Sequence, residues 1–126
     1  FTDRRQRQMC IRDSTNTNMV RAQLSQAELS DIMAKGAILT HAVLNRTNLN
    51  QADLTLTRMN HADLSRANLS GANLTDADLV EAFFARANLM GANLTNANLT
   101  RAELMSANLA GVILRGATMP DGKVHR

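Results

Sequence analysis

Two sets of side chains with groups suited to binding or catalysis recur at intervals of twenty residues. The first set is His41, His61 and Glu81. The second set is Arg46, Arg66 and Arg86. Imidazole and carboxylate are ligands that suit zinc, and the planar guanidinium binds a carboxylate through two parallel hydrogen bonds. Whether either set forms a site depends on a structure that brings residues twenty positions apart together.

A shorter period of five underlies this spacing. In residues 65–79, SRANLSGANLTDADL, the triplet Ala-(Asn/Asp)-Leu recurs every five residues. Residues five apart lie about 140° from each other around an α-helix, so the leucines form no buried stripe. In one long strand, an odd repeat puts successive leucines on opposite faces. A chain that bends the same way after each Ala-x-Leu segment keeps both side chains on one axis, which predicts a solenoid.

The pattern has an inward central residue every fifth position from Leu24 to Met119, and Ala34 is the one small centre. Ile32 stands where Ala is usual, so we expect Ile32 and Ala34 to exchange the large and small roles at roughly constant buried volume. Each buried Leu contributes about 1.5 to 3 kcal/mol before chain entropy is subtracted. The predicted core contains Leu24, Leu44, Leu64, Leu69, Leu74, Leu79, Phe84, Leu89, Leu94, Leu99 and Leu104.

The tandem motif A(D/N)LXX resembles the pentapeptide repeat family over residues 17–119. The resemblance implies an all-β fold, a right-handed quadrilateral parallel β-helix with four repeats per coil and about five coils. Residues 114–122, LRGATMPDG, also resemble the tail of many cyanobacterial members. We therefore assign residues 17–119 to the repeat domain and residues 120–126 to a C-terminal tail.

The first residues do not follow the pattern. Residues 7–14, RQMCIRDS, back-translate into the mosaic-end adapter of transposase-based sequencing libraries. We interpret residues 1–16 as a non-native or disordered tail, with a natural basic cap as the alternative. A first coil without its natural cover predicts that the protein self-associates end to end or frays at this coil. The compartment stays open, because a targeting signal that precedes this tail is not excluded.

The charge and cysteine content depend on this interpretation. The chain has a formal net charge of +3, but residues 1–21 carry five Arg against two Asp. Residues 22–119 carry seven basic and eight acidic side chains, so the repeat body is nearly neutral. The single cysteine, Cys10, lies in the adapter and says nothing about disulfides or metal ligands. No run of residues is long and apolar enough to predict a membrane span.

Residues twenty apart in such a coil stack in columns about 4.8 Å from each other. Zinc ligands must converge to about 2 Å from one point, whereas His41, His61 and Glu81 point in parallel, so we predict no metal site. The Ser and Thr residues after the centres have no His and carboxylate to activate them, and we expect their hydroxyls to bond local backbone. The Gly residues form no phosphate-binding loop. The sequence therefore predicts neither an enzyme nor a cofactor.

Other columns have structural interpretations. Charges of opposite sign are neighbours in the column that begins with His41 and ends with Arg101 and Asp121. Gly71, Gly91 and Gly111 form a column that suits tight corners with positive φ. Asn68, Asn88 and Asn108 form a column whose amides we expect to bond to one another along the axis.

Several apolar residues occupy outward positions, where scattered apolar side chains are usual and a contact patch is the alternative; those of the N-terminal part could also lie under missing sequence. The outward apolar residues are Met33, Ile38, Val43, Phe83 and Ile113. Phe84 takes the inward place, so Phe83 must point outward. We predict that Arg46, Arg66 and Arg86, with Val43 and Phe83, dock an acidic, partly apolar protein surface, while Asp63 and Glu103 offset part of the repulsion among the arginines. Solvated arginines that splay apart are the alternative.

The sequence thus favours a non-catalytic protein-interaction or scaffold solenoid whose partner is undefined. The rival within the family is a DNA-mimicking topoisomerase (gyrase) protection protein, which needs a strongly negative surface. The nearly neutral body and the three arginines oppose that function, and we expect neither a nucleic-acid nor a membrane partner. An ice-binding face of repeated Thr is a further alternative, but Thr is scattered over several faces.

Overall fold

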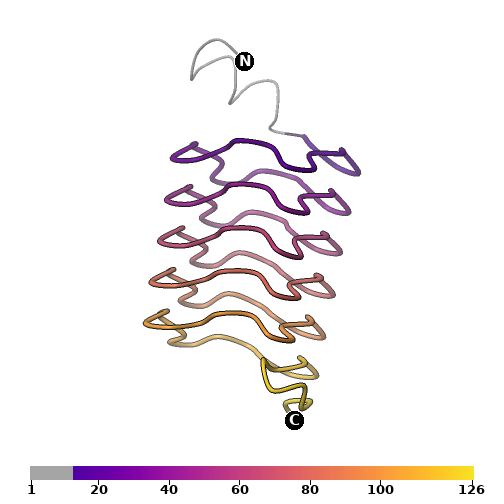
Figure 1. Ribbon diagram of the computed structural model, residues 1–126, viewed down its shortest axis with the longest axis vertical. Helices are drawn as coiled ribbons and strands as arrows, with labels where there is room; N and C mark the ends of the chain where they lie inside the picture. Colours follow the sequence, from indigo (N-terminus) through magenta and orange to yellow (C-terminus); the bar gives the residue numbers. More distant parts are fainter. Residues whose placement is uncertain (1–12) are drawn as a thin grey trace.

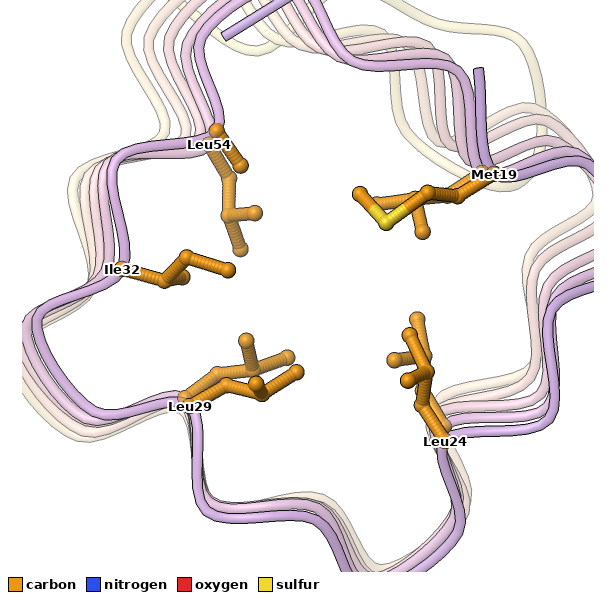
Figure 2. A pocket seen from close by; sticks show the side chains of 9 residues that line it. Met19, Leu24, Leu29, Ile32 and Leu54 are labelled. Carbon is orange, nitrogen blue, oxygen red and sulfur yellow. The ribbon is translucent and has the colours of Figure 1, made fainter. Parts of the chain in front are cut away.

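The chain winds around one axis as a stack of coils (Figure 1). The computed structural model describes residues 13–126. Outward residues pair through parallel bridges with the residue twenty positions later, as Val43 does with Asp63 and Asp63 with Phe83. Twenty residues are four pentapeptides, and the coil encloses a four-cornered interior (Figure 2). Within residues 13–126 there is no helix and no strand longer than a single bridge residue, so the β-structure is a ladder of isolated bridges.

Every backbone amide of a regular repeat has an acceptor, as residues 63–67 show. The amides of Asp63, Leu64 and Arg66 donate to carbonyls of the neighbouring coils at N···O distances of 3.0, 2.7 and 2.9 Å. The Ala67 amide closes the corner onto the Leu64 carbonyl at 3.1 Å. The Ser65 amide donates to the Asp63 carboxylate at 3.0 Å. An Asn or Asp before the central Leu is therefore part of the corner, because its side chain satisfies the one amide that no carbonyl reaches.

Each corner has positive φ at the second residue after the centre. The predicted glycines adopt it, with φ of 67° at Gly71, 71° at Gly91 and 69° at Gly111. Positive φ at this one position defines a type II turn, which favours Gly or Asn there. Within residues 13–126, sixteen non-glycine residues adopt the same conformation. The sequence did not reveal this, because the corner geometry is set by the coil and imposed on whichever residue stands there.

The core is a column of Ala and Leu side chains along the axis. The predicted core residues are buried, with Phe84 fully enclosed, except that Leu104 is only partly buried. The prediction for Leu104 was wrong because Leu104 lies in the last coil, where no further coil covers it. Thr47 and Thr57 replace Ala in the interior, and their hydroxyls donate to the carbonyls of Leu24 and Leu54 at 2.8 and 2.7 Å.

A small apolar cavity lies on the axis near the N-terminal end (Figure 2). Its volume is about 10 Å³, and Met19, Leu24, Leu29 and Ile32 point into it. Ile32 and Ala34 are both buried, as expected. Their exchange nevertheless leaves space, because Ala34 also lines the cavity. A cavity this small and apolar holds no stable water.

The first and last segments differ from the predicted boundaries. Among residues 13–126, the first bridge joins Asp13 to Met33, so bridged residues already precede residue 17. The adapter residues before Asp13 and the predicted N-terminal contact between copies lie outside the described residues. At the other end, the tail folds back so that Thr118 pairs with Val124 in antiparallel fashion. Within residues 13–126, no helix is long and apolar enough to cross a membrane.

Candidate interaction surface

Arg46, Arg66 and Arg86, called the arginine column below, occupy one corner of three successive coils. All three side chains are exposed, and their φ angles are 58°, 58° and 61°. Within residues 13–126 none of them forms an ion pair, because the ion pairs there join other residues. The column therefore combines mutual repulsion with a backbone conformation that L-residues rarely adopt.

The acidic residues beside the arginine column bond to their own corners. The Asp63 carboxylate accepts from the Ser65 amide at 3.0 Å and from the Ser65 hydroxyl at 2.6 Å. Glu103 accepts from the Met105 amide at 3.2 Å. We expected these carboxylates to offset the arginine charges, but neither forms an ion pair with Arg66 or another arginine of the column. The corner amides hold the carboxylates on the coil instead.

Val43, Asp63, Phe83 and Glu103 form the column that precedes the arginines in each coil, called the alternating column below. Phe83 points outward with 52% of its surface exposed, as predicted, while Val43 is half-buried. Neither side chain can accept the corner hydrogen bond that Asp63 accepts. Within the described part of the chain, the amides of Asn45 and Ala85 consequently have no acceptor. An apolar residue at these two places gives up a local hydrogen bond, which distinguishes it from an ordinary exposed side chain.

The neighbouring corner carries His41, His61, Glu81 and Arg101, called the mixed column below. The two imidazole rings stack with centroids 4.8 Å apart and planes 6° from parallel. His61 Nδ1 lies 3.3 Å from Glu81 Oε2, and Arg101 Nη2 lies 3.2 Å from Glu81 Oε1. The predicted pairing of opposite charges is confirmed for Glu81 and Arg101. Asp121 instead accepts from the Lys123 amide at 3.0 Å.

The mixed column does not converge as a metal centre requires. The parallel rings direct their nitrogens side by side rather than toward one point. Within residues 13–126, no group of three His, Cys, Asp or Glu side chains has a metal-binding arrangement. The metal-site interpretation of His41, His61 and Glu81 therefore has no support from the geometry.

Two sequence predictions about polar columns were wrong in detail. Asn68, Asn88 and Asn108 accept the corner amide two residues later, each at 3.0 Å, rather than bonding along the axis. Hydroxyls at the corners donate mainly to the preceding Asn or Asp side chain, as Ser70 does to Asn68 at 2.7 Å. Both outcomes have one cause: the corner amide is the nearest unsatisfied donor, and the Asn oxygen is the nearest acceptor.

Leu56 is an exposed residue that the sequence analysis did not single out. It occupies a corner with φ of 60° and exposes 51% of its surface. A bulky residue in this conformation is unusual. The signal was present in the sequence, since Leu56 stands two residues after the central Leu54, where polar residues or Gly are usual.

Comparison with known proteins agrees with the repeat geometry. A family model of pentapeptide repeats, in eight copies, matches residues 35–71, 67–104 and 84–120. The chain belongs to the pentapeptide repeat family. The comparison with curated proteins gave no match.

Solved pentapeptide repeat proteins resemble this chain in structure. One from the thylakoid lumen of Arabidopsis thaliana has 31% identity and a TM-score of 0.69, over 70% of this chain and 61% of its own. Rfr23 from the cyanobacterium Cyanothece 51142 has 26% identity and a TM-score of 0.61, over 99% of both chains. QnrB1, a plasmid-mediated fluoroquinolone resistance protein, has 17% identity and a TM-score of 0.54, over 86% of this chain and 66% of its own. The last similarity concerns the fold alone.

Proposed function

We propose that this pentapeptide repeat protein is a non-catalytic interaction solenoid. In this proposal the arginine column, with Val43 and Phe83, docks an acidic, partly apolar surface of another protein. We also propose that the solenoid winds in the right-handed sense, as the family resemblance implies. The observation that supports the docking proposal most is the arginine column itself, which is exposed and carries three like charges without an ion pair within residues 13–126.

The cost of the column to the isolated chain supports a role outside the chain. Gly71, Gly91 and Gly111 occupy the equivalent place at the next corner without strain. Asn at the arginine positions would also tolerate the left-handed conformation and would remove the repulsion. Phe83 likewise gives up a corner bond that Asn supplies in other repeats. Local features that cost stability and cluster on one surface are typical of binding sites.

The chemistry of the surface indicates the class of partner. Guanidinium groups bind carboxylates through two hydrogen bonds and tolerate partial desolvation. Arg and aromatic residues are enriched where protein interfaces are buried. An acidic protein surface with apolar side chains therefore complements the arginine column and Phe83 together.

The proposal is tested by affinity capture from the organism that carries the gene, followed by titration with the purified partner. Replacing Arg46, Arg66 and Arg86 by Gln should weaken binding at least tenfold and flatten its salt dependence without lowering Tm. The matched control replaces Arg58, Arg101 and Arg115 by Gln, which removes the same charge elsewhere. Equal affinities of the two triple variants would contradict the assignment of this surface.

A gyrase supercoiling assay separates this proposal from topoisomerase protection. The repeat body carries seven basic and eight acidic residues over 22–119, and a mimic of DNA needs a strongly negative surface. We expect no inhibition of gyrase. Inhibition by the full chain that persists in the arginine triple variant would favour the rival function.

A further inference from the structure

The spacing of the arginine column restricts the shape of its partner. The backbone amides of Arg46, Arg66 and Arg86 donate to carbonyls of the following coil at 3.0, 2.9 and 2.9 Å. These bonds fix the three Cα atoms at the coil spacing of about 4.8 Å, while the exposed guanidinium groups stay free to reorient. A partner that presents carboxylates at nearly the same interval engages all three with the least adjustment of the side chains.

We infer that the partner segment is an α-helix that lies along the solenoid axis with one carboxylate per turn over the arginine column. This inference rests on the proposed function. Side chains one turn apart on a helix recur at about 5.4 Å, whereas same-side residues of an extended strand recur at about 6.6 Å. Over three arginines the mismatch is about 1 Å for a helix and about 4 Å for a strand, so long Arg side chains match the helix with little adjustment.

The alternating column adds a second constraint on the same partner. Val43 and Phe83 are apolar, whereas Asp63 and Glu103, between and after them, are acidic. A uniformly negative polymer would meet repulsion from these two carboxylates while it binds the arginines. A helix avoids this because adjacent residues point about 100° apart. The complementary helix therefore has an acidic stripe over the arginine column and a neighbouring stripe in which apolar and basic residues alternate.

Synthetic peptides test this inference with the 126-residue chain. The probe is a capped helical peptide of about 16 residues, long enough to form a helix in water, with both stripes. A second peptide has the same composition with its Glu residues distributed around the helix. A third is a strand-forming peptide with Glu at every second position, and single-stranded DNA serves as the polyanion. Fluorescence anisotropy at low and high salt gives the dissociation constants.

We expect the striped helix to bind at least tenfold more tightly than the other three probes. Replacing Arg46, Arg66 and Arg86 by Gln should remove this preference, while the control at Arg58, Arg101 and Arg115 keeps it. Phe83→Asn should weaken the striped helix about threefold to tenfold, because its apolar contact is lost. Asn occupies the equivalent place in other repeats, so this variant retains the fold.

The outcomes distinguish the inference from the function on which it rests. If the strand, the redistributed helix or the DNA binds as tightly as the striped helix, and the arginine triple variant weakens that binding, the helical partner is contradicted while the docking surface stands. Failure of the striped helix to bind at millimolar concentration also contradicts the helical partner. If the arginine triple variant binds every probe as the unmodified protein does, both the helix and the surface are contradicted.

Discussion

Two neighbouring corners of the same solenoid use their charges in different ways. In the mixed column, Glu81 lies within 3.3 Å of His61 and 3.2 Å of Arg101. The arginine column has three like charges and no ion pair within residues 13–126. Both columns have positive φ at every member from coil to coil. The backbone is therefore the same, and only the side chains differ.

The charges of the mixed column pair with one another within the solenoid. Those of the arginine column do not, and we propose that they bind a partner. Glu81 is half-buried and contacts a neighbour on each side, so the mixed column offsets its own charges. Beside the arginine column, Asp63 and Glu103 accept hydrogen bonds from corner amides and form no ion pair with the arginines. The backbone conformation is common to both columns, so the arginine column differs only in carrying three like charges without an ion pair within residues 13–126. This difference is the ground on which we propose a partner for it.

The largest expected effect tests the inward and outward register on which both columns depend. Leu69→Asp buries a carboxylate with no partner on the axis and should lower the free energy of unfolding by about 4 kcal/mol or more. Arg66→Asp changes an outward residue and should alter stability by less than about 1 kcal/mol. Urea denaturation measures both. Equal losses at the two positions would show that the register is wrong.

A smaller effect is expected at Phe83, beside the arginine column. Phe83→Asn supplies an acceptor for the Ala85 amide, which lacks one within residues 13–126. The new hydrogen bond should raise the free energy of unfolding by about 1 kcal/mol. Thermal melts measure the gain, and Phe83→Ser, with a shorter acceptor side chain, is the comparison. If Phe83→Asn lowers the stability instead, Phe83 stabilises the solenoid by packing against its surface, and the proposed role in partner binding is not needed to explain it.

The smallest effect is expected in the mixed column. Glu81→Gln removes the carboxylate charge beside His61 and Arg101, whose side chains are 38% and 70% exposed. Exposed ion pairs of this kind contribute about 0.2 to 1 kcal/mol. The loss should be larger at low salt than at high salt, because salt already screens the pair. A loss above 2 kcal/mol in urea denaturation would contradict the view that Glu81 makes only exposed ion-pair contacts.

The sequence was sufficient to predict the repeat and its inward residues, because a period of five with Ala and Leu two apart has few structural solutions. It also placed Phe83 outside and Phe84 inside, since adjacent residues cannot share one face. It could not predict which acceptor each polar side chain would choose. Asn68 bonds the corner amide rather than Asn88 because that amide is closer, a distance that only the coil geometry determines.

The sequence placed the three arginines in one column but did not predict the energetics of that column. Spacing alone placed the arginines in one column and suggested that Asp63 and Glu103 compensate them. The positive φ at Arg66 and the local bonds of Asp63 follow from a corner that is identical at Gly and non-Gly residues. Leu104 differed for a related reason, since burial in the last coil depends on what lies beyond it.

The most direct test of the central claim is the salt dependence of stability in the arginine column. Replacing Arg46, Arg66 and Arg86 by Asn relieves their repulsion and places a residue that tolerates positive φ at each corner. At low salt we predict a free energy of unfolding about 1 kcal/mol or more above that of the unmodified protein, with the difference shrinking as salt is added. If the triple Asn protein is instead less stable than the unmodified protein at every salt concentration, the arginines stabilise the solenoid itself. That result would contradict the claim that the arginine column costs the isolated chain stability.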